Sequence, residues 1–349
     1  MKKIADRKRK SAKKQAKRLP GIGRLPKWTV LLVIYLICAS IATVVILHHN
    51  PQADPETEAL KRNCACALLA LFAILFTAWY DKLMVLPVEL FGSRRLILRL
   101  AHNDFKKRYA GSYMGVVWAF VQPIVTVVMY WLIFDVLSTA REALMGGSKI
   151  PYVLFLTTGI APWFFFTEAL NTGTNSLIEY HYLVKKVVFK ISILPLIKVM
   201  SAFYVHVFFT LLAIGLAAIY GIYPSMMLLQ LPYYMLCVFI LALAICYMTC
   251  AVNVFFRDLA QIISIVLQLM QWATPILWNL DMISDKYKAI VKLNPMVYIV
   301  NGYRESICGG SWFFEHFYSS TYFWLITAAL FAIGSLIFKR TKIHFADVL

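Results

Sequence analysis

Long apolar runs separated by short polar segments make up most of this chain of 349 residues. A helix needs roughly 20 consecutive apolar residues to cross a bilayer, and about eight runs approach that length. Their continuous rather than alternating pattern predicts helices and excludes a β-barrel. We expect spans near residues 28–47, 64–80, 113–136, 152–178, 200–220, 231–256, 260–280 and 321–338.

A basic amphipathic segment, residues 94–109, precedes the third run. Its apolar residues Ile97, Ala101, Phe105 and Tyr109 recur every four positions, and basic or polar residues occupy the other positions. Such a helix is predicted to lie at the membrane–water boundary with its apolar face among acyl chains. Because only a turn of three small residues joins it to the next span, we expect it to transmit force between the cytosol and the membrane.

The segment that follows the seventh run is also unusual. Within residues 281–318, the apolar piece Pro295–Cys308 is too short to cross and ends at Gly309 and Gly310. This pattern predicts a pair of re-entrant or interfacial helices on the outer side. The chain shows no internal repeat, which disfavours a secondary transporter built from inverted repeats.

Composition narrows the class to a polytopic all-α membrane protein. Hydrophobic residues make up 61% of the chain, mean hydropathy is +0.69, and no room is left for a soluble domain of ~100 residues. The formal charge is +18, yet alternating spans from a cytoplasmic N-terminus place 27 of the 35 Lys and Arg residues inside and 8 outside. This bias sets topology and argues against nucleic-acid binding.

These observations predict three regions. Residues 1–27, with twelve Lys or Arg, form a basic cytoplasmic tail that touches anionic lipid. Residues 28–86 form two additional membrane helices, the first a retained anchor because no cleavage site follows it. Residues 87–349 form the main domain. We expect both termini to be cytoplasmic and the protein to reside in a bacterial inner membrane.

The sequence contains no pattern that predicts a catalytic site or a metal site. Six of the seven cysteines lie in apolar runs without a nearby His or carboxylate cluster, which indicates packing. There is no phosphate-binding loop, since residues 146–149 do not fit the G-x-x-x-x-G-K-S/T pattern of such a loop. There is also no Ser/His/Asp constellation. We therefore predict no catalytic residue, no metal site and no cofactor in this chain. A transporter of this kind needs a separate motor.

Polar residues at membrane depth are costly and form two candidate groups. In the span at 152–178 and just beyond it, Glu168, Asn171 or Thr172, Asn175 and Glu179 recur at helical spacing. They fit the wall of a wet pathway, which we favour, or interhelical hydrogen bonding.

In the seventh run, Ser264, Gln268 and Gln271 share a face near Trp272 and Trp278. Amides bond hydroxyls and flat rings cover the apolar faces of sugars, so this face suits a glycan. A glutamine row can equally join two helices.

Two predicted cytoplasmic connections are too short to hold an enzyme but can dock on one. The loop at about 181–198 is basic and amphipathic, and contains Lys185, Lys186 and Phe189. The turn between the sixth and seventh runs contains Arg257 and Asp258.

Together these segments resemble the permease subunits of ABC-2 type polysaccharide exporters over about residues 90–349. The resemblance rests on motifs in the family's order: Asp104-Phe-Lys-Lys-Arg-Tyr-x-Gly-Ser-x-x-Gly-x-x-Trp118, Gln122-Pro123, Pro162-Trp-Phe-Phe-Phe-x-Glu168, Leu183-Val-Lys-Lys-Val-Val-Phe189, Phe256-Arg-Asp258, Thr274-Pro-Ile276 and Asn294-Pro295. Each motif is weak alone, and the set is specific.

The resemblance implies a homodimer of six-span subunits paired with two cytosolic ATPase subunits, which hold ATP and Mg. Such exporters carry lipid-linked glycans such as O antigen, teichoic acid or capsular polysaccharide. Residues 94–109 would be the interface helix and the loop at about 181–198 the coupling loop.

The hypothesis assigns three groups of residues. The expected ATPase interface comprises Asp104, Lys106, Lys107, Arg108, Tyr109, Lys185, Lys186, Phe189, Arg257 and Asp258. The expected glycan canal comprises Trp118, Gln122, Trp163, Phe166, Glu168, Asn171, Asn175, Gln268, Gln271, Trp272 and Trp278. The expected external gate comprises Asn294, Pro295, Tyr298, Tyr303 and Arg304.

Two alternatives stay open. An ABC-2 exporter of a drug or small lipid would have a drier, narrower cavity than the polar stripe suggests. A membrane-embedded lipid-linked glycosyltransferase would need acidic or metal-binding residues grouped in one loop, and the sequence has none.

Overall fold

The computed structural model describes residues 27–47, 55–138, 142–145, 148–185 and 189–349. The predicted basic tail, apart from Lys27, and the predicted site residue Lys186 lie outside these ranges. The chain packs as two units, residues 1–97 and 98–349, which we describe separately. The division falls within helix α5, whereas the sequence placed the domain boundary at residue 87.

The first unit is a helical hairpin followed by a short helix. It contains α2 (Lys27–Leu47), α3 (Pro55–Leu83), α4 (Val85–Gly92) and the start of α5 (Arg94–Arg108). Helices α2 and α3 run antiparallel, because Lys27 Nζ lies 3.2 Å from Asp81 Oδ2 and the Tyr35 and Thr77 hydroxyls are 2.7 Å apart. Most of the hairpin's side chains are exposed, as expected for helices surrounded by lipid.

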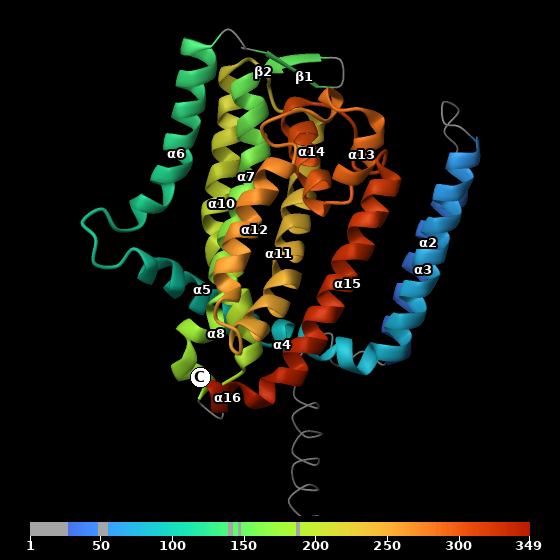
Figure 1. Cartoon of the computed structure of the whole chain (residues 1–349), viewed down its shortest axis with the longest axis vertical. Helices are drawn as coiled ribbons and strands as arrows, with labels where there is room; N and C mark the ends of the chain where they lie inside the picture. Colours follow the sequence, from blue (N-terminus) through green and yellow to red (C-terminus); the bar gives the residue numbers. More distant parts are fainter. Residues whose placement is uncertain (1–26, 48–54, 139–141, 146–147, 186–188) are drawn as a thin grey trace, which may run out of the picture. The chain divides into compact units, whose positions relative to one another are not determined.

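The second unit is a bundle of long helices with short elements at both ends (Figure 1). After α5 its elements are η2 (Gly115–Val117), α6 (Trp118–Trp131), η3 (Leu132–Leu137), β1 (Glu142–Met145), β2 (Ser148–Pro151), α7 (Tyr152–Thr174), α8 (Ser176–Glu179), α9 (His181–Val184), η4 (Ile191–Ile193), α10 (Leu194–Ile219), η5 (Met226–Gln230), α11 (Leu231–Asn253), α12 (Leu259–Ala273), η6 (Leu280–Met282), α13 (Asp285–Val291), α14 (Pro295–Cys308), α15 (Phe317–Thr341), η7 (Lys342–His344) and α16 (Phe345–Val348).

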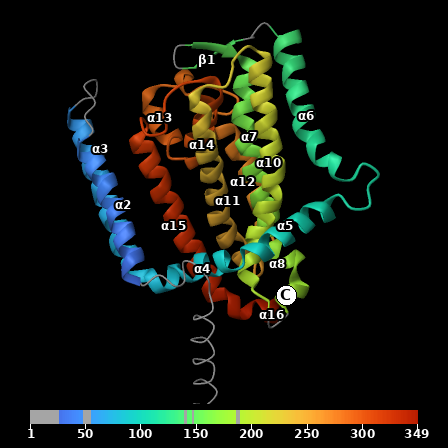
Figure 2. The ribbon, with the colours of Figure 1, turned by 180° about the vertical axis from the view of Figure 1, so that it is seen from behind.

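Helix α7 is the centre of this bundle. It packs against α10, α11, α12 and α14, and most of its residues are buried. Small residues allow the close approaches, since a Cβ at Gly173 would lie only 2.4 Å from Cys246 Sγ. Both views place β1, β2, α13 and α14 at one end of the bundle and α8 and α16 at the other (Figure 2).

Seven helical segments in the described part of the chain are long and apolar enough to cross a membrane, which confirms a polytopic all-α fold. The seventh predicted span, 260–280, is wrong in its length. Helix α12 has 15 residues, or about 22 Å, against roughly 30 Å for a bilayer core. It ends because Thr274 precedes Pro275, which disfavours helical dihedrals, and Thr274 takes φ −84° and ψ 137°.

Two other features differ from the prediction. Helix α10 begins at Leu194, six positions before the predicted span, because Ile191–Ile193 already form a turn of 3-10 helix. An antiparallel hairpin, β1 paired with β2 from Glu142↔Pro151 to Met145↔Ser148, was not predicted. The signal for it was Gly146-Gly147 between two short segments, a common hairpin sequence.

Helix α5 forms as predicted and ends at Arg108. Ile97, Ala101 and Phe105 are all buried. The ring of Phe105 lies 5.4 Å from that of Tyr204 on α10. The expectation that this apolar face lies among acyl chains is therefore wrong at Phe105, because protein covers it.

Candidate functional site

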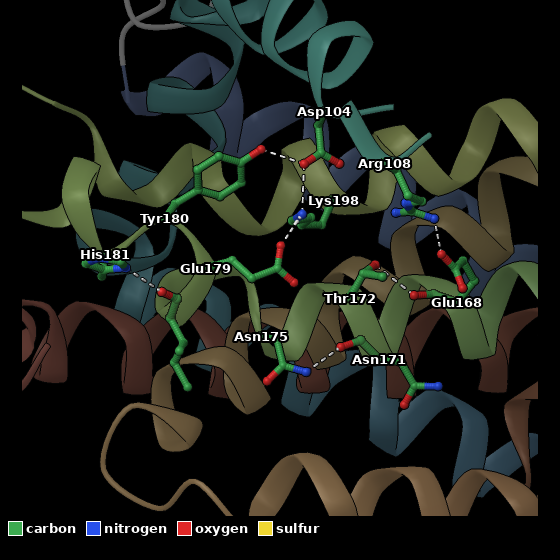
Figure 3. A network of polar contacts seen from close by, with 11 residues as sticks. Asp104, Arg108, Glu168, Asn171, Thr172, Asn175, Glu179, Tyr180, His181 and Lys198 are labelled. Carbon is green, nitrogen blue, oxygen red and sulfur yellow. Dashed lines mark hydrogen bonds and ion pairs between the residues drawn. The ribbon is translucent and has the colours of Figure 1, made fainter. Parts of the chain in front are cut away.

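A network of charged side chains joins α5 to α8 and α10 at one end of the bundle (Figure 3). Lys198 Nζ on α10 lies 2.8 Å from Asp104 Oδ1 on α5 and 2.5 Å from Glu179 Oε2 on α8. Tyr180 donates a 2.5 Å hydrogen bond to the same Asp104 oxygen, and its ring lies 5.0 Å from Lys198 Nζ. We call Asp104, Glu179, Tyr180 and Lys198 the α5 network.

Burial differs within the α5 network. The side chains of Asp104 and Lys198 are 6% and 8% exposed, whereas Glu179 is 49% exposed. Burial alone would raise the pKa of Asp104, but hydrogen bonds from Lys198 and Tyr180 and the charge of Lys198 outweigh it and lower this pKa. Burial and the bond to Asp104 raise the pKa of Tyr180. Asp104 is therefore a carboxylate with a cationic partner at neutral pH.

A second ion pair extends the contact between α5 and the bundle. Arg108, one turn after Asp104, pairs with Glu168 on α7 (Figure 3). A cavity of about 370 Å³ lies beside both ion pairs, and Lys107, Thr172 and Tyr182 also line it. Two of the cations that line this cavity, Arg108 and Lys198, are paired with carboxylates. The end of α5 is thus joined to α7, α8 and α10.

The polar stripe on α7 connects to a different helix at each position. Besides the Glu168 contact, Asn171 accepts a 3.0 Å hydrogen bond from Ser264 on α12. Asn175 accepts a 3.1 Å bond from the Asn253 amide on α11. Interhelical hydrogen bonding therefore accounts for the stripe, rather than the wet wall that we favoured. Contact of Glu168, Asn171 or Asn175 with a glycan stays a prediction.

The remaining predicted ATPase-interface residues lie on connections and helix ends. Lys106, Lys107 and Lys185 are exposed, and Tyr109 and Phe189 are half-buried. Arg257 and Asp258 are exposed in the turn between α11 and α12. A docking role for these residues is untested.

The predicted canal residues divide by exposure. On α6, Trp118 and Gln122 are exposed, as are Gln268 and Trp272 on α12. Gln271 and Trp278 are half-buried, and Trp278 donates to the Trp272 carbonyl at 3.0 Å. Trp163 and Phe166 are buried inside the subunit at 1% and 7% exposure, so they are removed from the canal wall. Their helix is covered on most sides, which the sequence pattern did not reveal.

Predicted external-gate residues lie at the opposite end, where two are buried and the other three are half-buried. Tyr303 and Arg304 are fully buried, and the Tyr303 hydroxyl lies 2.6 Å from His206 Nε2 on α10. Tyr298 is half-buried and its hydroxyl lies 2.7 Å from that of Ser320. Asn294 caps α14, directly before Pro295. Tyr303 and Arg304 therefore cannot form the moving surface of a gate and are corrected to internal contacts.

Sequence reasoning missed Lys198, Tyr180 and Asn253. Lys198 had a usable signal, because a lone cation beside an apolar run normally has a buried partner. The predicted span began two residues after it, which placed it in a loop. Among the described residues, no three His, Cys, Asp or Glu side chains gather as metal ligands.

The fold defines a multi-pass helical membrane protein whose basic surface helix is ion-paired to the bundle. Residues 95–308 match the family described as ABC-2 type transporter. The chain belongs to the ABC-2 type transporter family. Among its relatives are two Klebsiella pneumoniae proteins named O-antigen export system permease protein RfbA, each 30% identical over 73% of this chain and 95% of their own length. A Myxococcus xanthus protein of the same name is 31% identical over 65% of this chain and 84% of its own.

Proposed function

We propose that this chain is the membrane subunit of an ATP-driven exporter of a lipid-linked polysaccharide. Two copies would act with two separate ATPase chains that bind ATP and Mg. The name shared by the relatives supports a glycan substrate, and the alignment spans nearly the whole length of two of them. Family membership supports a transport role rather than the glycosyltransferase alternative.

The observation that carries the coupling part of the proposal is the position of Lys198. One buried ammonium group holds a carboxylate of α5 and a carboxylate of α8, and α8 leads into the predicted coupling loop. Separating these partners would leave a buried charge without its counter-ion, which is costly. A push on the coupling loop is therefore passed to α5 and α10 together.

The same reasoning orients the protein in the membrane. The end that carries α8 and α9, the α11–α12 turn and α16 faces the cytoplasm and the ATPases. The end that carries β1, β2, α13 and α14 faces outward. Both termini are cytoplasmic, and the membrane is the bacterial inner membrane.

The exposed polar and aromatic side chains of α6 and α12 are the proposed glycan path. Helix α12 is amphipathic, and of its residues only Leu267 is buried in the single chain. Exposed amides such as Gln122 and Gln268 are costly against lipid. Facing the second copy, they would instead line a canal in which amides bond sugar hydroxyls and Trp118 and Trp272 cover apolar sugar faces.

The test combines a binding assay with a transport assay. The chain is co-expressed with the ATPase encoded beside it, and co-purification and ATP-dependent appearance of glycan on the outer side are measured. Cells that lack the chain should accumulate lipid-linked glycan inside. Phe189→Ala should reduce ATPase binding and export together, whereas the matched control Phe314→Ala, which changes an exposed aromatic residue at the other end, should retain ATPase binding.

Unchanged surface glycan in cells without the chain would overturn the substrate assignment. Export of a drug or small lipid by the purified complex, with no glycan transport, would favour the dry-cavity alternative. Full export by Phe189→Ala would overturn the coupling assignment.

A further inference from the structure

Arg304 on α14 is a buried cation that contacts only neutral groups. Its Nη1 and Nη2 donate hydrogen bonds of 2.7 Å to the carbonyls of Pro275 and Ile276, and its Nε donates one of 3.2 Å to that of Phe155. The guanidinium carbon lies 3.6 Å from the centre of the Phe155 ring. Within the described ranges, no carboxylate forms an ion pair with it. We call Arg304 and these three carbonyls the Arg304 clamp.

The surroundings of the clamp are shaped for a guanidinium. A Cβ at position 159 would lie 2.7 Å from Arg304 Nη2, so Gly159 on α7 leaves the space that the planar group occupies. Three carbonyls in different directions and one aromatic face suit the fixed fork of an arginine. A lysine has a single ammonium group and cannot reproduce this arrangement.

The carbonyls of Pro275 and Ile276 belong to the non-helical segment that follows the C-terminal end of α12. Because the helix stops at Ala273, these groups have no helical partner, and unpaired carbonyls at membrane depth are costly. A second contact holds the same stretch, since Asn294 Nδ2 at the start of α14 donates a 2.9 Å bond to Thr274 Oγ1. Helix α14 therefore holds residues 274–276 at two points along its length.

We propose that Arg304 is a positioning residue that locks the non-helical end of α12 to α14, so that α12, residues 274–276 and α14 move as one body during transport. Pulling them apart would expose the carbonyls of Pro275 and Ile276 and a guanidinium where water cannot replace the lost bonds. Because Arg304 also bonds to the Phe155 carbonyl of α7, opening of the outer end must then occur between these elements and helices other than α7. The contacts of the clamp do not depend on the proposed export function, but the role given to this motion in transport rests on it.

The experiment measures a distance across the clamp by electron paramagnetic resonance. Spin labels are placed at Leu269→Cys on α12 and Leu293→Cys beside α14, both exposed positions, in only one copy of the chain per complex, after the accessible native cysteines are replaced. In the complex with its ATPase, the distance distribution should be narrow and the same without nucleotide and with ATP trapped. Arg304→Gln should broaden it.

Two further variants separate positioning from general stability. Arg304→Lys should restore part of the narrow distribution, because it retains a cation and one or two of the bonds, and it replaces Arg304→Gln as the test if that variant does not fold. Arg340→Gln, which removes an exposed arginine from the end of α15, should change nothing. Arg304→Gln should also lower the amount of glycan exported per ATP hydrolysed more than it lowers ATP hydrolysis.

The results that would overturn the proposal are distinct from those that would overturn the function. A wild-type distance that changes with ATP, or a narrow distribution in both Arg304 variants, contradicts the clamp. If the chain is not an ATP-driven exporter, ATP will have no effect on any sample, but broadening by Arg304→Gln without nucleotide will still support the clamp.

Discussion

The α5 network and the Arg304 clamp each place a buried cation near one end of the same bundle, but they neutralise it differently. Lys198 is held by two carboxylates from side chains, one of them half-exposed. Arg304 is held by three backbone carbonyls and an aromatic ring. Side chains rotate, ionise and exchange partners, whereas carbonyls are fixed to the backbone that carries them. The first arrangement suits contacts that change during a cycle, and the second suits contacts that do not.

The difference fits the proposed direction of coupling. At the α5 network, buried Asp104 fixes Lys198, whereas half-exposed Glu179 can rotate against the same ammonium group without leaving it, so α8 can tilt and still pull on Lys198. At the Arg304 clamp, no bond breaks without leaving an unpaired buried group. Motion would enter at the end that holds the α5 network, where one carboxylate is buried and the other is half-exposed, and would reach the rigid body of the Arg304 clamp at the other end.

The largest expected effect is at Lys198. Lys198→Met leaves the Asp104 carboxylate buried without its cation, and breaking a buried pair from one side costs about 3–5 kcal/mol. We expect a large fall in the thermal unfolding temperature of the detergent-solubilised protein, with a matching loss of folded yield.

A double substitution tests whether this loss comes from charge. Asp104→Asn combined with Lys198→Met removes both charges, and exchanging a buried pair for neutral groups is often nearly neutral. The double variant should therefore recover most of the stability that Lys198→Met loses. A double variant as unstable as the single one would show that the α5 network does not depend on the ion pair.

The second effect is at Arg304, where no such rescue exists. Arg304→Met retains the length of the side chain but removes the donors, and each buried acceptor left unpaired costs about 1–3 kcal/mol. Two carbonyls, those of Pro275 and Ile276, lose their partner, whereas that of Phe155 still accepts from the Thr158 hydroxyl. We therefore expect a total loss of about 2–4 kcal/mol in thermal unfolding, in the lower part of the range for two acceptors. No second side-chain substitution should restore it, because the partners are backbone carbonyls. Full recovery by any single neutral substitution around the clamp would contradict this contrast.

The two clusters should also differ in acid. Because the pKa of Asp104 is lowered in the folded protein, its contribution to stability is complete above the ordinary value of about 3.8 and is lost as the pH falls through the lowered value. Wild type and Asp104→Asn should thus converge in unfolding temperature below pH 4. The gap between wild type and Arg304→Met should stay constant there, since carbonyls do not titrate in this range.

The sequence predicted the helices better than it predicted the contacts between them. Apolar runs place the long helices because burial in lipid acts on each run separately. The α5 network joins positions 104, 179 and 198, which are brought together only by packing, and Asp104 alone of these three was predicted as part of an interface. The α7 stripe was interpreted as one wet face because helical spacing does not reveal that each position meets a different helix.

The Arg304 clamp shows where more could have been predicted. Pro275 was a readable signal for the end of α12, and Thr274-Pro-Ile276 and Asn294-Pro295 were noticed as separate motifs. What the sequence could not show is that α14 holds both motifs, because that depends on α14 packing against α7. Arg304 was assigned to a gate surface for the same reason, since an arginine in a short external helix normally faces water.

The smallest expected effect tests whether pH sensitivity at the α14 end of the bundle arises beside the clamp rather than within it. Glu305, the residue after Arg304, lies 3.0 Å from His316 Nε2, and this pairing raises the pKa of His316 although partial burial opposes it. Glu315 also raises this pKa and Lys292 lowers it. Because the pKa of His316 is raised in the folded protein, the contribution of this residue to stability is complete below about pH 6.5, the ordinary histidine pKa. The contribution is lost as the pH rises through the pKa of His316 in the folded protein.

With a His316 side chain that is 40% exposed, the pair is worth less than about 1 kcal/mol. His316→Gln should lower the unfolding temperature slightly at pH 6 and match wild type at pH 8.5, and Glu305→Gln should remove the same dependence. Arg304→Met should retain the dependence, because the pair does not include Arg304. Loss of the pH dependence in Arg304→Met would show that the clamp and the titrating pair are one unit, and the contrast between a titrating network and a fixed clamp would then fail at the α14 end of the bundle.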